Sequence, residues 1–371
     1  MKTKKNFMKK QLIILTIFYV ISIISIYSFQ TFLPATMNNL IFKQTCYYIL
    51  GFLLILALKK VGITRILKYS FFIYIANIIL LLAVLLFGDE INGARAWFVI
   101  PFVGSFQPSE FMKIGIILFS AKILEKTEIR SLKDEFFVIL KLLIVILIPA
   151  VLTFLEPDTG AVIAYLVIFL VMLFISGIRY RWFVIFGLVA GGLLASFLYL
   201  FFNKPNLFID ILGSDFFYRL DRIFDWRSAS GMQLENSLLA IAGAGILGNG
   251  INTIPIYYPE GQTDFIFTSF ASCFGFIGVL ILIGLIVFFD INLVSKALTT
   301  KKKIYKFIIT SFVGVLLYQQ VQNIAMTVGL LPIMGITLPF ISYGGSSLIS
   351  FMVIMGIIFA IDDQDVKNHN Y

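Results

Sequence analysis

The sequence predicts an all-α, polytopic membrane protein with about ten transmembrane helices and one large extracytoplasmic loop. Hydrophobic residues make up 60% of the 371-residue chain, and the mean hydropathy is +0.97. A soluble domain cannot bury so much apolar surface, whereas lipid acts as a solvent for it. The apolar runs are about 17–25 residues long and lack two-residue alternation, so we expect helices rather than a barrel.

The whole chain, 1–371, is expected to form a single integral membrane domain. The large loop covers about 203–264. The expected spans lie near 11–29, 46–58, 69–87, 108–123, 136–154, 161–176, 182–202, 265–289, 304–328 and 346–361.

Lys and Arg are concentrated in alternate loops. If the N-terminus is cytoplasmic, the cytoplasmic loops near 59–68, 122–133, 179–181 and 296–306 carry most of the positive charge. This asymmetry follows the positive-inside rule. It predicts that both termini are cytoplasmic and that the 203–264 loop lies outside.

The charged and reactive residues exclude several classes of function. The net charge of +9 comes from Lys and Arg in short loops, so we expect binding to membrane lipid and no binding to nucleic acid. His369 is the single histidine, which excludes Ser-His and Cys-His catalysis and a His-rich metal site. Cys46 and Cys273 lack CxxC spacing and are interpreted as small buried hydrophobes.

The first polar cluster combines a segment containing Arg95 with the start of the fourth span. Pro108 suits the first turn of a helix, with Gln107 or Ser109 as a cap. Glu110 and Lys113 are three residues apart and share a helix face at the mouth of an apolar run, where ionisable groups are costly. They form either a self-neutralising pair that eases membrane insertion, or a charged site that faces a cavity and meets an anion.

Three further segments contain polar residues on the same predicted outer side. Segment 156–160 has turn chemistry in which Asp158 either caps the next helix or serves a site. Segment 338–347 has the composition of a broken helix that lines a cavity. The outer loop contains three arginines, which suit an anionic phosphate or pair with acidic residues of the same loop: Arg219, Arg222 and Arg227. The glycine-rich segment 242–250 lacks the Gly-Lys-Ser/Thr of a P-loop, and close backbone packing explains it more simply.

Asp264 ends the longest polar interruption, where the apolar run from Phe265 begins. A carboxylate at a membrane boundary needs a partner, and no cation is adjacent in the chain. We therefore expect other segments to supply cations and donors to it.

Together these segments resemble the SEDS family (shape, elongation, division and sporulation), the RodA/FtsW glycosyltransferases, over nearly the whole chain. The style of the early motifs favours the RodA-like branch. The matching motifs are Asn92-Gly93-Ala94, Gln107-Pro108-Ser109-Glu110 with Lys113, Pro157-Asp158-Thr159-Gly160, Thr263-Asp264-Phe265-Ile266-Phe267, Phe274-Gly275-Phe276-Ile277-Gly278, Gly329-Leu330-Leu331-Pro332 and Leu338 to Ser347.

The resemblance implies a peptidoglycan glycosyltransferase that polymerises lipid II outside the bacterial cytoplasmic membrane, for cell-wall synthesis and cell shape. It also implies a class B penicillin-binding protein as partner. The essential aspartate of the family falls on Asp264, and its Glu and Lys fall on Glu110 and Lys113. The chain departs from the family at Gln262, where His is usual, and at 271–273, where a Glu is usual.

The reaction joins an acceptor sugar hydroxyl to an anomeric carbon whose leaving group is a lipid pyrophosphate. Asp264 is the expected general base, Lys113 would orient it or neutralise pyrophosphate, and Glu110 would hold Lys113. Positive charge at the pyrophosphate would come from Lys, Arg or a divalent cation such as Mg²⁺ or Mn²⁺, and no organic cofactor is expected. The expected substrate-binding residues are Arg95, Arg219, Arg222, Arg227, Gln107, Ser109, Asp158, Ser342 and Ser346.

Two alternatives remain open. A lipid II flippase or transporter would also use many spans and buried charges, although no inverted repeat is visible in the sequence. A non-catalytic scaffold for the penicillin-binding protein would fit the missing Glu at 271–273.

Overall fold

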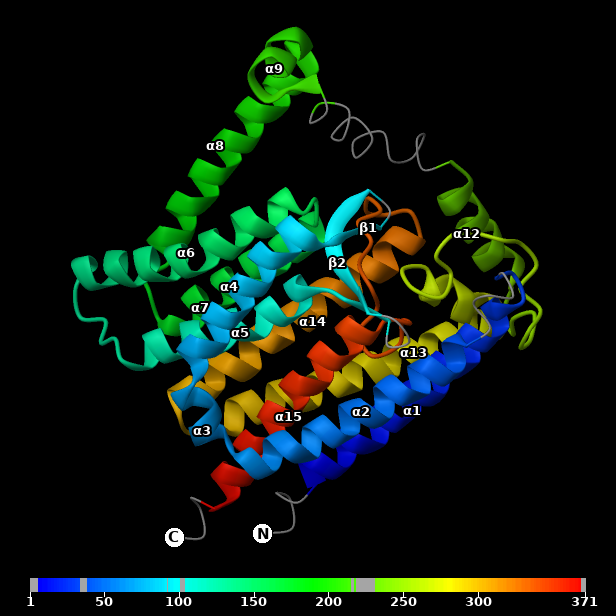
Figure 1. Ribbon diagram of the computed structural model, residues 1–371, viewed down its shortest axis with the longest axis horizontal. Helices are drawn as coiled ribbons and strands as arrows, with labels where there is room; N and C mark the ends of the chain where they lie inside the picture. Colours follow the sequence, from blue (N-terminus) through cyan, green and yellow to red (C-terminus); the bar gives the residue numbers. More distant parts are fainter. Residues whose placement is uncertain are drawn as a thin grey trace.

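The computed structural model describes residues 6–33, 39–91, 93–100, 104–214, 217 and 231–367. Helices dominate, as predicted, and pack into an elongated bundle (Figure 1). The helices of the first half are α1 (Asn6–Gln30), α2 (Leu40–Val61), α3 (Ile63–Lys68), α4 (Ser70–Phe87), α5 (Pro108–Glu125), α6 (Leu132–Leu155) and α7 (Thr159–Ser176). Those of the second half are α8 (Arg181–Asn203), α9 (Pro205–Leu212), α12 (Gly231–Gly243), α13 (Ile266–Thr299), α14 (Lys303–Thr327) and α15 (Gly345–Lys367).

The described helices confirm a polytopic membrane protein. Nine of them are long and apolar enough to cross a membrane. The fourth expected span corresponds to α5, which has 18 residues but a mixed composition. All four of its charged residues fall within these 18 residues, whereas each of the other nine helices contains an 18-residue stretch with at most two. The four in α5 are Glu110, Lys113, Lys122 and Glu125. Helix α1 begins and α15 ends at the same end of the bundle (Figure 1).

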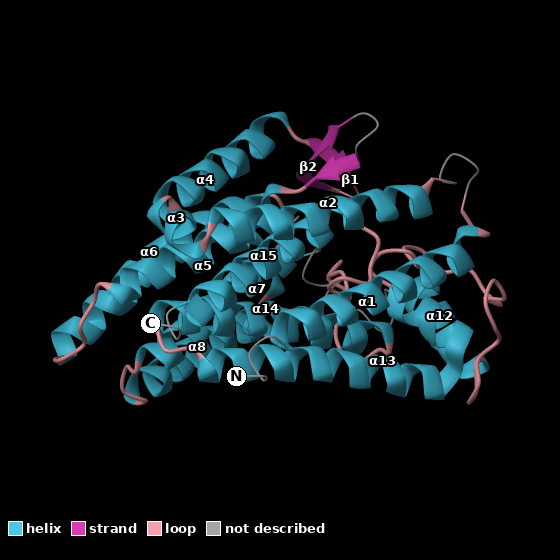
Figure 2. Ribbon diagram, turned by 90° about the horizontal axis from the view of Figure 1, so that it is seen from below, coloured by secondary structure: helices cyan, strands magenta, loops and turns pink. Residues whose placement is uncertain are grey.

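A small antiparallel sheet interrupts the helical pattern. This sheet was not predicted from the sequence. It has the order β1-β2-β3, from strands β1 (Asp89–Ile91), β2 (Ala94–Ile100) and β3 (Gly104–Phe106). Aromatic and β-branched residues of β2 favour an extended chain. Gly93 has φ +80 in the tight turn between β1 and β2, a conformation that favours glycine. Figure 2 shows the sheet at an edge of the helical bundle, beside the end of α4.

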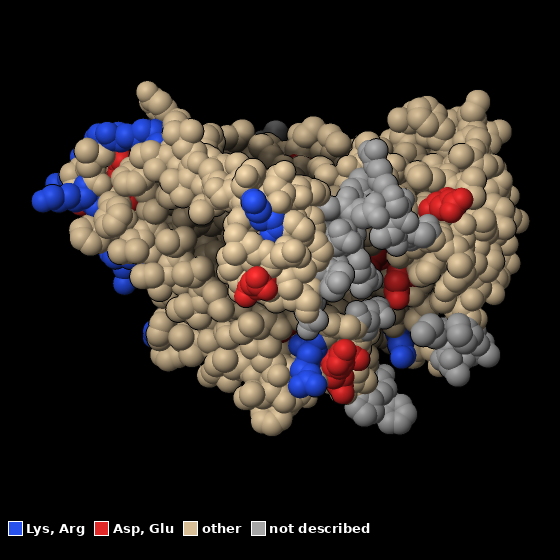
Figure 3. Space-filling model, turned by 90° about the horizontal axis from the view of Figure 1, so that it is seen from above, with Lys and Arg blue, Asp and Glu red and all other residues tan. Residues whose placement is uncertain are grey.

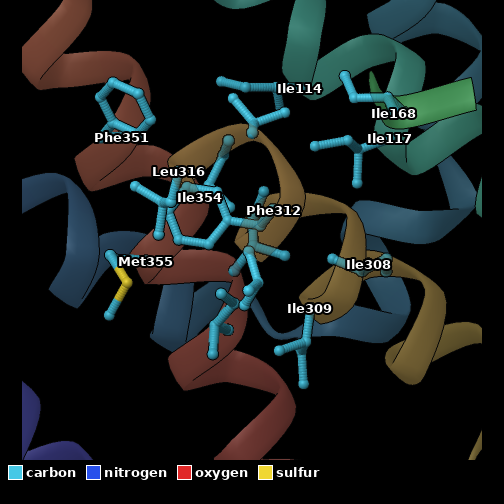
Figure 4. Close-up of a cluster of buried hydrophobic side chains, with 14 of the residues drawn as sticks. Ile114, Ile117, Ile168, Ile308, Ile309, Phe312, Leu316, Phe351, Ile354 and Met355 are labelled. Atoms are coloured by element: carbon cyan, nitrogen blue, oxygen red, sulfur yellow. The ribbon is translucent and has the colours of Figure 1, made fainter. Parts of the chain in front are cut away.

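The centre of the bundle is formed by α14 and α15. In the most apolar stretch of each helix, 67% of the residues of α14 and 72% of those of α15 are buried. Helix α15 packs against α2, and α14 packs against α7 and α13. Figure 4 shows Ile and Phe side chains of α14 interdigitating with those of α5, α7 and α15. By contrast, Phe201 is the one buried residue recorded along α8, and α8 projects away from the bundle with α9 (Figure 1).

Charges are sparse on much of the surface. Figure 3 shows one face that is largely uncharged, with Lys and Arg gathered toward one end. Exposed large hydrophobic side chains such as Phe72, Phe87 and Leu188 are 65–78% exposed. An apolar exterior of this kind suits contact with lipid.

The glycine-rich segment 242–250 packs its backbone closely, as predicted, and it does so against a break in α13. Gly275 has φ +62 inside α13 and interrupts the helix. The freed backbone groups pair with the segment: Phe276 N–H donates to Gly245 O at 3.0 Å. A Cβ on Gly248 would lie 2.2 Å from the Cys273 carbonyl oxygen, so this contact requires glycine. The break at Gly275 lies two residues after the stretch 271–273, where the sequence lacks the expected Glu.

Candidate functional site

A cavity of about 430 Å³ opens where segments far apart in sequence converge. Its wall is formed by β2, the starts of α5 and α7, the turn before α13, and the loops between α14 and α15. Four carboxylates lie on this wall: Glu110, Asp158, Glu260 and Asp264. Among the residues that the structure describes, no Lys or Arg lines it.

Asp264 is held by its main chain. The backbone of Glu260 is left-handed, with φ +57, and its carbonyl oxygen accepts hydrogen bonds from Thr263 N–H at 3.1 Å and Phe265 N–H at 3.0 Å. The Asn323 carboxamide donates to the Asp264 carbonyl oxygen at 2.8 Å. These bonds fix the turn that presents Asp264 to the cavity.

The carboxylate of Asp264 is half-buried, and it has no hydrogen bond or ion pair with any residue in the described part of the chain. Its Oδ2 lies 3.6 Å from where a Cβ on Gly335 would sit, so the opposite wall is close. Burial, followed by the nearby Glu260 carboxylate, raises the pKa of Asp264 to about 7. A carboxyl group with this pKa can take up and release a proton near neutral pH.

Asp158 is held by its side chain. Its Oδ2 accepts hydrogen bonds from Gln107 Nε2 and Ser109 Oγ, both at 2.9 Å. Its Oδ1 caps α7 by accepting from Ala161 N–H at 3.0 Å. Burial raises the pKa of Asp158, although these hydrogen bonds oppose the shift. Asp158 therefore caps a helix, as one interpretation of this turn predicted, and it also lies on the cavity wall.

Glu110 and Lys113 form a buried ion pair of 2.7 Å on α5. Glu110 Oε2 also accepts from Ser350 Oγ at 3.1 Å, which ties α5 to α15. The Lys113 side chain is 1% exposed, and its Nζ lies 5.1 Å from the centre of the Phe351 ring. Glu110 reaches the cavity, whereas Lys113 lies behind it and is not part of the lining.

The remaining polar residues of the predicted site have mainly structural contacts. Gln107 does not cap α5 with its side chain, which bonds Asp158 instead. Ser346 Oγ accepts from Gln107 N–H and donates to Ser105 O, each at 2.9 Å, at the cavity wall. Ser342 Oγ donates to Thr263 O at 2.7 Å, which supports the turn before Asp264.

The predicted arginines do not meet the carboxylates in the described structure. Arg95 is exposed on β2, opposite Glu90 in the strand register, and it does not line the cavity. The three loop arginines lie outside the described residues: Arg219, Arg222 and Arg227.

Sequence reasoning missed several residues of the wall. Glu260 and Thr263 line the cavity, and Thr263 Oγ1 donates to Glu260 Oε2 at 2.6 Å. Gln319 also lines it, from the middle of α14. Polar residues within an expected span are a signal that could have pointed to Gln319 and Asn323.

No group of three or more His, Cys, Asp or Glu residues comes together as a metal site within the described ranges.

Comparison with known proteins identifies the family of the chain. Residues 7–367 match the FtsW/RodA/SpoVE family, described as cell cycle proteins. The chain is 33% identical to a probable peptidoglycan glycosyltransferase FtsW of Thiomicrospira cyclica, over 80% of this chain and 76% of the relative. It is 32% identical to the peptidoglycan glycosyltransferase MrdB of Helicobacter pylori, over 85% of this chain and 81% of that protein.

Solved structures agree with the sequence relatives. A chain of a peptidoglycan synthase complex that coordinates polymerization and crosslinking is similar with a TM-score of 0.79 and 28% identity, over 96% of this chain and 97% of that chain. The rod shape determining protein RodA of Thermus thermophilus gives a TM-score of 0.69 and 26% identity, with 96% of both chains covered. The match along nearly the entire chain, in sequence and in structure, shows that this multi-pass membrane protein belongs to the FtsW/RodA/SpoVE (SEDS) family.

Proposed function

We propose that this protein is a peptidoglycan glycosyltransferase that polymerises lipid II into glycan strands at the outer face of the bacterial cytoplasmic membrane. The observation that carries this proposal is Asp264, a cavity carboxylate with a fixed main chain, a pKa raised to about 7, and oxygens that no described residue pairs with. The activity given in the names of the FtsW and MrdB relatives supports it. The product would serve cell-wall synthesis and cell shape.

In the proposed mechanism Asp264 removes the proton from the acceptor sugar hydroxyl. The hydroxyl oxygen forms a bond to the anomeric carbon of the donor as the bond from that carbon to the lipid pyrophosphate breaks. The pyrophosphate leaves as an anion and needs no proton, so one carboxylate base is sufficient. A base that titrates near neutral pH is well suited to this step.

Other residues would hold the base and the substrate. The buried pair of Glu110 and Lys113 fixes the start of α5 beside the cavity. Asp158, held by Gln107 and Ser109, forms another part of the cavity wall, while Ser342 and Ser346 support the adjoining loops.

Positive charge for the departing pyrophosphate would come from Arg95, from Arg219, Arg222 and Arg227, or from a divalent cation such as Mg²⁺ or Mn²⁺. The four carboxylates on a wall without a described Lys or Arg support the need for such an added cation. Omitting divalent cations from the assay tests this part of the proposal.

The protein would work with a class B penicillin-binding protein whose transpeptidase cross-links the new strands. Its structural similarity to a chain of a peptidoglycan synthase complex supports this partnership. Both termini would lie in the cytoplasm and the cavity outside, as the distribution of Lys and Arg indicates.

The decisive experiment measures glycan polymerisation by the purified protein with its penicillin-binding partner and lipid II. We expect the wild type to form polymer and Asp264→Ala to form none above background. If Asp264→Ala polymerises at the wild-type rate, Asp264 is not the base. Transbilayer movement of labelled lipid II that persists in Asp264→Ala, without any polymer from the wild type, would favour the transporter alternative.

A further inference from the structure

Helix α14 carries a set of carboxamide side chains in its C-terminal half: Gln319, Gln320, Gln322 and Asn323. The last three donate hydrogen bonds to other elements over 2.7–3.3 Å. Gln319 differs from them. It is 4% exposed, it lines the cavity, and its carboxamide has no hydrogen-bond partner in the described part of the chain, with Oε1 buried and unpaired.

A buried carboxamide without a partner is costly, because it has lost its hydrogen bonds to water. Such a group is retained at low cost when a ligand supplies the missing partners. The mechanism proposed above does not use Gln319, although Gln319 lies on the same wall as Asp264 and Asp158. Its position therefore suggests recognition of a group on the substrate.

The chemistry of the side chain indicates which group it would recognise. A carboxamide donates and accepts in one plane, whereas an ionised carboxylate only accepts. When ionised, the carboxylates of the cavity can receive hydrogen bonds from sugar hydroxyls, but they cannot donate to a carbonyl oxygen. An acetamido group presents an N–H and a C=O together, and Gln319 complements both.

We infer that Gln319 is a specificity-determining residue that recognises the acetamido group of an N-acetylated sugar bound in the cavity. The inference rests on the proposed function, because the sugars of peptidoglycan strands carry acetamido groups.

The placement of Gln319 links this recognition to the reacting atoms. Asn323 follows Gln319 by one helical turn, about 6 Å along the axis. Asn323 holds the Asp264 carbonyl oxygen at 2.8 Å and the Ile336 carbonyl oxygen at 2.7 Å. Gln319, which would recognise the sugar, and Asn323, which positions the base, thus belong to one rigid helix. A sugar anchored at Gln319 would present its ring at a defined height relative to Asp264.

The test compares native lipid II with two analogues, each having one of its two acetamido groups replaced by a free amine. Initial polymerisation rates are measured for the full-length protein with its penicillin-binding partner. We expect the wild type to discriminate against one analogue, and Gln319→Leu to lower kcat/KM for native lipid II by roughly 10- to 100-fold. The same variant should leave kcat/KM for that analogue within about twofold. Gln319→Glu, which is isosteric, should favour the cationic amine over the acetamido group.

Two controls separate recognition from structure. Gln320→Leu removes the neighbouring carboxamide, which bonds Asp290 away from the cavity wall, and should leave the ratio of the two substrates unchanged. Because Gln319 has no hydrogen-bond partner among the described residues, Gln319→Leu should not lower the melting temperature of the substrate-free protein.

Equal losses for native and analogue substrates in Gln319→Leu and Gln319→Glu would overturn the assignment of Gln319. A lowered melting temperature with unchanged discrimination would also overturn it. A wild-type protein that polymerises none of the three substrates would instead overturn the proposed function, and the inference with it.

Discussion

Two aspartates line the same cavity and are held in opposite ways. Both oxygens of Asp158 accept hydrogen bonds, from Gln107, Ser109 and the backbone of Ala161. Asp264 has none on its carboxylate in the described structure, and its main chain is fixed by Asn323. A buried carboxylate with saturated oxygens anchors the fold, whereas one with free oxygens on a fixed backbone is available for proton transfer.

The physical origin of the difference lies in what each hydrogen bond favours. Donors that point at a carboxylate stabilise its charged form, so they oppose the effect of burial on Asp158. No residue in the described ranges donates to the Asp264 carboxylate, and burial together with Glu260 raises its pKa to about 7. The same desolvation that makes Asp264 costly to ionise makes it a stronger base than an aspartate in water.

The largest expected effect separates the two aspartates by activity. Asp264→Asn should lower polymerisation by about 10²- to 10⁴-fold, because it removes the base. It should leave the melting temperature unchanged or slightly higher, since no hydrogen bond to the side chain is lost. Polymerisation assays and thermal unfolding in detergent measure both quantities. An active Asp264→Asn protein would show that Asp264 is not the base.

A third carboxylate, Glu110, differs from both aspartates because its partner is a charged side chain. Lys113→Met would leave Glu110 buried with Ser350 as its remaining described partner, and should cost about 3–5 kcal/mol of stability. The double variant Glu110→Gln with Lys113→Met removes both charges and should recover much of that loss. Denaturant titration in detergent compares the two variants. Equal stability of both would show that the ion pair is not the source of the effect.

Asp158→Asn should have the reverse profile to Asp264→Asn. The amide cannot accept all three hydrogen bonds, so we expect a loss of about 1–3 kcal/mol in the free energy of unfolding. Activity should fall by about tenfold or less, because the loss acts through the shape of the wall. Ser346→Ala, which affects the same wall without touching Asp158, serves as the matched control. A large activity loss without any loss of stability would place Asp158 in the chemistry.

The smallest expected effect concerns pH. With the pKa of Asp264 raised to about 7, activity should rise with pH and reach half its maximum near that value, because the base must be deprotonated. Glu260→Gln removes the second cause of the shift and should move the profile to lower pH by less than about one unit. An unchanged profile in Glu260→Gln would exclude Glu260 as a contributor.

The contribution of Asp264 to the stability of the folded protein changes with pH in the opposite direction to activity. The ordinary pKa of an unfolded aspartate is 3.8, and that of folded Asp264 is about 7. Between these values the folded chain holds a proton that the unfolded chain has released. The contribution of Asp264 to the free energy of unfolding therefore decreases as pH rises through this window, and Asp264→Asn should abolish that component.

Much of the fold could be predicted from hydropathy, because a lipid-spanning helix needs a long apolar run wherever it lies in the chain. The turn at Asp158 and the backbone packing of Gly248 could also be predicted from the sequence, since capping and glycine contacts depend on local chemistry. The sheet around Trp97 was not anticipated, because short strands give weak signals beside long apolar runs. The exposed position of Arg95 follows from that sheet.

By itself, the sequence determined the class of the protein, the order of its spans and the motifs that include Asp264, because hydropathy and short motifs are properties of neighbouring residues. Only the tertiary structure decided which polar groups meet. It placed Lys113 behind Glu110, saturated Asp158 and left Asp264 open, and placed Gln319 on the cavity lining. These outcomes depend on contacts between helices far apart in the chain, where burial and hydrogen-bond partners are set by packing and not by local sequence.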